Sequence, residues 1–113
     1  MHEQSIVESL LALVLENAKK AKAGKILRIY LVVGELSGVV EEAVEFYFNI
    51  LSRDTIAAEA SLFFMSTPAQ VRCRHCNTVF NPENLDFHCP SCNEQQIEIT
   101  GGRELYIDSI EVE

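Results

Sequence analysis

The chain has 113 residues, of which 48% are apolar, and its 17 acidic and 9 basic side chains give a formal net charge of −8. This length and apolar content predict one compact domain, or one domain carrying a small insert. The acidic balance argues against a nucleic-acid partner, because nucleic-acid-binding proteins use Lys and Arg to displace counterions from phosphates.

The chain has no apolar run of membrane-spanning length, and its N-terminus lacks a basic region followed by an apolar core. We therefore expect no membrane partner and no signal peptide. The expected location is the cytoplasm, where thiols stay reduced and can bind metal ions.

The N-terminal third is predicted to form a helix and then a strand. Ser5 and Glu8 have the form of a capping box, and Gly24 is typical of a helix stop. Apolar side chains at helical spacing between them predict a helix over residues 5–22. Residues 25–33 alternate as a strand, with Leu27, Ile29, Leu31 and Val33 on one face and Arg28 and Tyr30 on the other.

A turn over residues 34–38 is followed by a second predicted helix that runs to about Arg53. Ser37 or Gly38 is expected to cap it, and Glu41 and Glu42 suit the positive end of the helix dipole. Its buried stripe is predicted to contain Val40, Ala43, Val44, Tyr47, Phe48 and Leu51. Residues 60–65 then form a second predicted strand.

Two further strands are expected near the C-terminus, over residues 97–100 and 105–112. A three-residue loop between them would pair Ile99 with Leu105, whereas a two-residue Gly-Gly turn would spoil the apolar alternation. The apolar positions also shift phase before Ile110, which predicts a bulge near residues 108–109.

The four cysteines of the chain form two Cys-x-x-Cys pairs, CRHC and CPSC, separated by the twelve residues 77–88. Two such pairs can close a tetrahedral four-sulfur cage, which is the ligand set of structural zinc. Two disulfides are the alternative in an oxidising compartment, and iron is the alternative in the same cage. A four-thiolate zinc ion has no open position, so we expect Cys73, Cys76, Cys89 and Cys92 to stabilise structure.

The element order predicts an α+β fold in which two helices cover a small three-stranded mixed sheet, with an inserted zinc-ribbon module. We expect residues 1–69 and 97–113 to form one domain and residues 70–96 to form the inserted zinc-binding domain.

The first three residues also concentrate metal ligands. The terminal amine of Met1, the amide and imidazole nitrogens of His2 and the Glu3 carboxylate can converge on one ion. A nitrogen-rich site of this kind suits Ni(II) or Cu(II), and Ni(II) is preferred where no soft ligand is present. A cation there would meet the positive end of the first helix, so the anionic Glu3 has a reason to be present.

Taken together, several motifs make the chain resemble the HypA/HybF family of nickel metallochaperones for [NiFe]-hydrogenase maturation. They are the opening Met1-His2-Glu3, the following helix, Val33-Gly34-Glu35-Leu36-Ser37, the two cysteine pairs and the ending Ser109-Ile110-Glu111-Val112-Glu113. The resemblance implies a nickel-binding domain with an inserted zinc domain, His2 as the essential nickel ligand with Glu3 beside it, and the four cysteines as zinc ligands. It also implies two partners, the nickel GTPase HypB and the hydrogenase large-subunit precursor.

The chain departs from the family pattern at two places. Val40 stands where some members carry a nickel-binding aspartate, and Glu41 or Glu42 is the candidate substitute. Some members have a histidine after each cysteine pair, whereas here His75 lies inside the first pair and His88 precedes the second. We expect both histidines on the surface; a pH response through them is a speculation.

The function predicted from the sequence is delivery of nickel, without enzymatic activity, because four metal-bound thiolates leave no free nucleophile. The alternative function is a zinc-ribbon module for protein–protein or nucleic-acid interaction, in which the N-terminus plays no part. A homodimer is plausible through exposed strand edges.

Overall fold

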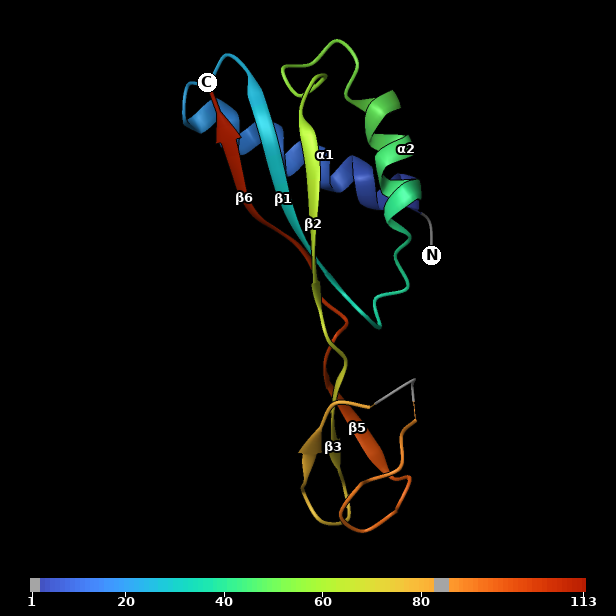
Figure 1. Cartoon of the computed structure of the whole chain (residues 1–113). Helices are drawn as coiled ribbons and strands as arrows, with labels where there is room; N and C mark the ends of the chain where they lie inside the picture. Colours follow the sequence, from blue (N-terminus) through green and yellow to red (C-terminus); the bar gives the residue numbers. More distant parts are fainter. Residues whose placement is uncertain (1–2, 83–85) are drawn as a thin grey trace.

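The computed structural model describes residues 3–82 and 86–113 and is elongated, with principal extents of 55 × 24 × 17 Å. Two three-stranded sheets lie one above the other (Figure 1). The upper part, here called the helical lobe, contains α1 (Glu3–Lys20), β1 (Ile26–Gly34), α2 (Glu41–Leu51), β2 (Ser61–Thr67) and β6 (Leu105–Val112). The lower part, the cysteine lobe, contains β3 (Gln70–Cys73), β4 (Val79–Phe80) and β5 (Ile97–Gly101).

The sheet of the helical lobe has the order β2-β1-β6, with β2 parallel and β6 antiparallel to β1. In the view of Figure 1, α1 crosses behind this sheet and α2 lies to its right, next to β2. The predicted α+β class, with two helices on a mixed three-stranded sheet and an inserted cysteine module, is confirmed. In the described part of the chain, neither helix is long and apolar enough to cross a membrane.

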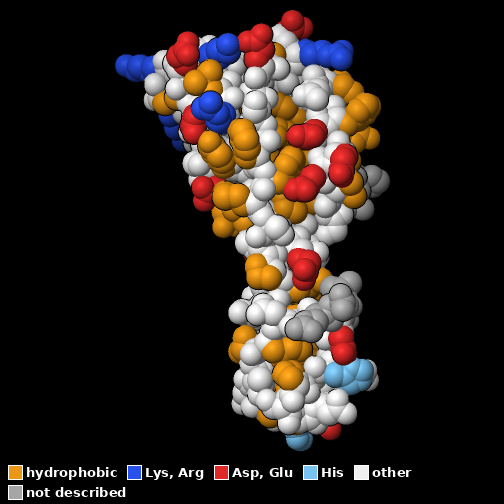
Figure 2. All heavy atoms as spheres, viewed as in Figure 1, with side chains coloured by type: hydrophobic (Ala, Val, Ile, Leu, Met, Phe, Trp, Pro, Cys, Tyr) orange, Lys and Arg blue, Asp and Glu red, His pale blue; other side chains and the backbone are white. Residues whose placement is uncertain are grey.

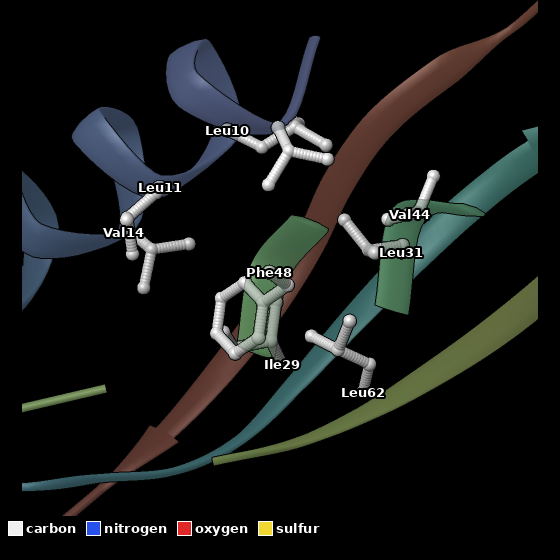
Figure 3. A pocket seen from close by; sticks show the side chains of 9 residues that line it. Leu10, Leu11, Val14, Ile29, Leu31, Val44, Phe48 and Leu62 are labelled. Atoms are coloured by element: carbon white, nitrogen blue, oxygen red, sulfur yellow. The ribbon is translucent and has the colours of Figure 1, made fainter. Parts of the chain in front are cut away.

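The core of the helical lobe is an apolar layer between the helices and the sheet. Side chains from α1, α2, β1 and β2 converge on a cavity of about 10 Å³ (Figure 3). A cavity of this size and apolar lining holds no cofactor, so these side chains serve packing. The side chains around it are Val7, Leu10, Leu11, Val14, Ile29, Leu31, Val44, Phe48 and Leu62.

Helix α1 differs from its prediction at both ends. It already includes Glu3, so Ser5 lies within the helix and is not its N-cap. At the other end the Lys22 N–H bonds the Lys19 carbonyl and the Ala23 N–H bonds the Ala18 carbonyl, which is a Schellman motif. Lys22, with φ of 56°, adopts the left-handed conformation expected of Gly24.

Helix α2 begins two or three residues later than predicted, since Ser37 or Gly38 was the expected cap. Val40 is the N-cap and is 50% exposed, so it does not belong to the buried stripe. The Ser37 hydroxyl accepts a hydrogen bond from the Val39 N–H within the preceding turn and does not cap the helix. Val44 and Phe48 are buried as predicted.

Two β-bulges determine which side chains of the paired strands β1 and β6 face the core. A register shift in β1 between Ile26 and Arg28 buries Ile26 in place of Leu27, which the alternation had placed in the core. A second register shift lies in β6. Tyr30 pairs with Ser109, but Leu31, the next residue of β1, pairs with Ile107. Asp108 is the extra residue, which confirms the predicted bulge.

The predicted pairing of Ile99 with Leu105 is wrong. Strand β5 pairs with β3 in the cysteine lobe, where Ile99 lies opposite Val71. The Gly-Gly segment makes no hairpin turn: Gly102, at φ of 101°, leads the chain from one lobe into the other. Local alternation cannot distinguish these arrangements, because β3 offers the same apolar pattern as β6.

Three segments meet at the neck between the lobes, namely residues 34–36, 67–69 and 102–104. The Leu36 N–H donates to the Gly102 carbonyl at 2.6 Å, and the Glu35 N–H donates to the Thr67 carbonyl at 2.9 Å. Backbones approach so closely here that a Cβ on Gly34 would lie 2.1 Å from the Gly102 oxygen. The neck therefore requires glycine at position 34 for space.

We predict that Gly34→Ala lowers the free energy of unfolding by more than about 2 kcal/mol, because the new methyl group meets backbone that cannot move aside. Urea unfolding followed by circular dichroism measures the change. Gly24→Ala is the matched control, since the nearest atom to its added Cβ is the Glu113 oxygen at 3.9 Å. Equal stability of the two variants would contradict the close approach at the neck.

Glu104 closes the neck through hydrogen bonds to its carboxylate. The Thr67 hydroxyl donates at 2.6 Å and the Gly102 N–H at 2.9 Å, and these donors hold the pKa of Glu104 below its usual value. A carboxyl group with a lowered folded pKa stabilises the protein above its unfolded pKa of about 4.3, and this contribution is lost as pH falls through the folded pKa.

We therefore predict that wild type loses stability below about pH 4 more steeply than Glu104→Gln, which has no carboxylate to protonate. Urea midpoints measured from pH 3 to pH 7 give the difference between the two curves. Protonation of the cysteines is common to both proteins and cancels. Parallel curves would show that the Glu104 carboxylate contributes nothing.

Candidate metal centre

The two cysteine pairs converge at the lower end of the molecule, and their four sulfur atoms all lie within 4.8 Å of one another. The Sγ atoms of Cys73 and Cys92 are 3.5 Å apart, as are those of Cys76 and Cys89. A disulfide needs about 2.05 Å, so the four thiols are free. A tetrahedral ion bound at about 2.3 Å requires sulfurs about 3.8 Å apart, so the cage fits such an ion.

Both knuckles have the same backbone. The first cysteine of each pair accepts a hydrogen bond at 2.8 Å from the N–H of an asparagine, Asn77 or Asn93. The N–H of the same cysteine donates to the carbonyl of the residue after the asparagine, Thr78 or Glu94. Both asparagines adopt positive φ, 64° and 60°, which asparagine tolerates better than most residues. The sequence contains this signal as Cys-x-x-Cys-Asn in both pairs, and our sequence analysis missed it.

Burial differs within each pair. Cys73 and Cys89 are buried, at 0% and 1% exposure, whereas Cys76 is exposed and Cys92 is half-buried. Cys73 is fixed by strand β3, and Cys89 by its knuckle. A bound ion would thus be held from the interior by two fixed sulfurs and closed from outside by the other two.

The surroundings of the Cys76 and Cys92 thiols shift their pKa values in opposite directions. Hydrogen bonds from the Thr78 hydroxyl and backbone lower the pKa of the Cys76 thiol to about 6. At Cys92 the Glu94 N–H lowers the pKa, but burial and the three neighbouring thiols raise it to about 12. Cation binding requires thiolates, so loading this cage releases protons to solvent.

The two histidines of the cysteine lobe lie on its surface, as predicted, outside the four-sulfur cluster. His88 has its ring nitrogens at 2.6 Å from the Asp86 carboxylate and 2.9 Å from the Gln95 amide. The hydrogen bond from His88 holds the pKa of Asp86 below its usual value. Neither His75 nor His88 belongs to the ligand set.

The second predicted site falls at the start of the chain. Met1 and His2, and the Glu3 side chain, lie outside the described part of the structure. Helix α1 begins at Glu3, and its first turns lie beside the beginning of α2 (Figure 1). Val7 and Val44 line the same cavity, which fixes this contact. Glu41 and Glu42, in the first turn of α2, therefore lie at the same end of the helical lobe as the first turns of α1.

Over residues 3–82 and 86–113, the four cysteines are the one group of three or more His, Cys, Asp or Glu side chains close enough to share an ion. A small two-helix domain that carries a closed four-sulfur cage on a separate sheet defines a two-lobed metal-binding protein.

Comparison with known proteins gives the family. The model of the family described as "Hydrogenase/urease nickel incorporation, metallochaperone, hypA" matches residues 1–112, and the chain belongs to this family.

Similar curated proteins and solved structures span nearly the whole chain. Hydrogenase maturation factor HypA of Caldanaerobacter subterraneus subsp. tengcongensis is 43% identical over the full length of both chains. HypA of Dehalococcoides mccartyi strain 195 is 47% identical over all of this chain and 95% of its own. The solution structure of the Ni metallochaperone HypA from Helicobacter pylori superposes with a TM-score of 0.72 at 33% identity, covering 99% of this chain and 97% of that one.

We predict that Cys76→Ser, or treatment with a strong chelator, removes one metal ion per chain and unfolds the cysteine lobe. The helical lobe has its own core and keeps its fold. Elemental analysis gives the stoichiometry, and hydrogen exchange resolved by segment gives the protection of residues 70–101 and of α1.

Ser91→Ala is the matched control, because it removes a hydroxyl group from the second knuckle and no sulfur. It is expected to retain the metal ion. Full protection of residues 70–101 after metal removal would refute the dependence of this lobe on the cage.

Proposed function

We propose that this protein is a nickel metallochaperone that binds Ni(II) at its N-terminus and delivers it for maturation of [NiFe]-hydrogenase. The observation that carries the proposal is the family match over residues 1–112, which includes the opening Met1-His2-Glu3. The family description names nickel incorporation, and the similar curated proteins are named hydrogenase maturation factors.

The proposal assigns different ions to the two sites. Zn²⁺ is assigned to Cys73, Cys76, Cys89 and Cys92, because a tetrahedral cage of four thiolates is its usual structural site. Ni²⁺ is the cargo, and its ligands are the Met1 amine and backbone, His2 and Glu3. Nitrogen and oxygen ligands separate nickel from the soft sulfur cage.

The position of the terminal site supports release as well as binding. The proposed ligands precede or begin α1, and the first α1 residue that belongs to the core, among those the structure describes, is Val7. The positive end of the α1 dipole opposes a bound cation, and the Glu3 carboxylate offsets it. Glu41 and Glu42, in the first turn of α2, add negative charge at the same end of the lobe.

Delivery then proceeds by ligand exchange, in which thiolates of an acceptor replace His2 and Glu3 stepwise. The proposed partners are the nickel GTPase HypB and the hydrogenase large-subunit precursor, in the cytoplasm. The zinc-binding module, predicted to end at residue 96, is proposed to continue through β5 to Gly101, because β5 pairs with β3.

Calorimetric titration of untagged, zinc-loaded protein with Ni(II) tests the terminal site. Wild type is expected to bind one nickel ion. His2→Ala is expected to weaken binding by at least tenfold, since it removes the imidazole ligand, about 1.4 kcal/mol or more. A tag ahead of Met1 is expected to weaken binding too, because it consumes the terminal amine.

His75→Ala and His88→Ala are the matched controls, since each removes an imidazole from the surface of the cysteine lobe. Both are expected to bind nickel as wild type does. If His2→Ala and the tagged protein still bind one nickel ion with wild-type affinity, the terminal site is wrong and the interaction-module alternative gains.

A further inference from the structure

The outer edge of β2 is open for pairing. Strand β2 lies at the end of the sheet, and in the described part of the chain its only strand partner is β1. Its seven residues, SLFFMST, contain no charge, no proline and no register shift against β1. Natural proteins protect edge strands with charged side chains, prolines or bulges, so an edge strand that lacks all three can accept another strand.

The opposite edge of the same sheet is protected, which makes the contrast informative. Strand β6 has the Asp108 bulge and also carries Glu111, which pairs with Arg28. The bulge interrupts the regular ladder that a new strand would need. The fold therefore leaves one of its two sheet edges suited to strand addition.

A groove lined by α2 runs beside the open edge. Glu45 and Asn49 of α2 line it together with Ser61, Leu62 and Phe63 of β2. Near the other end of β2, Ser66 lines a hollow with Glu41 and Glu42. Figure 2 shows acidic side chains beside hydrophobic ones on this side of the helical lobe.

On the outer face of the sheet, Phe63 and Met65 are 43% and 40% exposed, and Phe63 stacks on Tyr30 at 5.3 Å. On the face toward the helices, Leu62 and Phe64 pack against the core. An added strand would thus meet an apolar surface on one face and acidic side chains of α2 on the other.

We propose that the β2 edge binds an extended peptide segment of a partner protein as a fourth strand, with Lys or Arg alternating with apolar residues. The apolar side chains cover Phe63 and Met65. The basic side chains lie toward α2, where their stems cover Leu62 and their charged ends reach Glu45. This inference does not depend on the proposed nickel site.

Charge decides against a second copy of this chain as the occupant. A two-fold pairing of β2 with β2 would place both α2 helices on the same face of a joined sheet. Their acidic side chains, Glu41, Glu42 and Glu45, would then face each other, in chains that each carry a net charge of −8. A basic segment neutralises the same charges.

Fluorescence anisotropy with full-length, zinc-loaded protein and a labelled nine-residue peptide of alternating Arg and Val tests the proposal. The peptide is expected to bind at least tenfold more tightly than its Glu-Val analogue at low salt. N-methylation of the amides along one peptide edge removes its ladder hydrogen bonds and is expected to weaken binding at least tenfold. Methylating each edge in turn identifies the parallel or antiparallel orientation, and binding that survives both modifications overturns the proposal.

Protein variants locate the site. Glu45→Lys is expected to weaken binding about threefold, as for loss of an exposed ion pair, and Met65→Lys is expected to weaken it further by charging the edge. Glu16→Lys is the matched control, because it makes the same charge change on α1 and is expected to leave binding within twofold. Equal loss in Glu16→Lys and Glu45→Lys would show unspecific charge attraction and overturn the proposal.

Sedimentation of the protein alone completes the test. A monomer at micromolar concentration supports the assignment of a foreign segment. A dimer that dissociates in Met65→Lys would identify a second copy as the occupant and overturn it.

Discussion

The closure of four sulfurs around one ion is the constraint on which the lower half of the molecule depends. The hydrophobic core cluster lies entirely in the helical lobe. Among the described residues of the cysteine lobe and its junction with the neck, the buried apolar side chains are few, chiefly Ala69, Val71, Cys73 and Cys89. A segment of about thirty residues with so little apolar burial is too small to fold by packing alone. We therefore expect metal binding at the cage to supply its folding free energy and to hold the paired knuckles and β3 together.

The neck transmits this rigidity to the helical lobe. Two backbone segments, residues 67–69 and 102–104, cross it, and the turn over residues 34–36 is bonded to both: Gly34 and Leu36 donate to residues 104 and 102, and the Glu35 carboxylate accepts from Ala69. The close approach of Gly34 and Gly102 leaves no side-chain layer between backbones that could slide. Residues 68–69 join β2 to β3 and residues 102–104 join β5 to β6, so two short connections, and not a single linker, hold the lobes together.

Spacing along the sequence was sufficient for features that local chemistry determines. The metal cage follows from two Cys-x-x-Cys pairs, and the Asp108 bulge follows from a shift in apolar phase. Features decided by distant contacts were missed. Strand β5 could pair with β3 or β6 on its alternation alone, and the bulge beside Leu27 becomes visible only once β6 is in place. The predicted helix ends were wrong for a related reason, because Lys22 and Val40 occupy cap positions that propensity assigns to glycine or serine. The nickel ligands of the first three residues stay a prediction, because no described contact involves them.

Tight retention and easy transfer make opposite demands on a metal site, and the proposed function assigns them to different parts of the chain. A closed cage of four ligands, two of them buried, resists exchange because an incoming ligand finds no free position. The proposed terminal ligands precede or begin α1, whose first core residue among those the structure describes is Val7, so the proposal assigns transfer to the end of the chain. The β2 edge connects this argument to recognition. Ser66, near its end, shares a hollow with Glu41 and Glu42, at the beginning of α2 and beside the first turns of α1. A peptide strand seated on β2 would therefore bring the body of its protein next to the first turns of α1, and under the proposed function this docking would raise the local concentration of acceptor ligands for nickel.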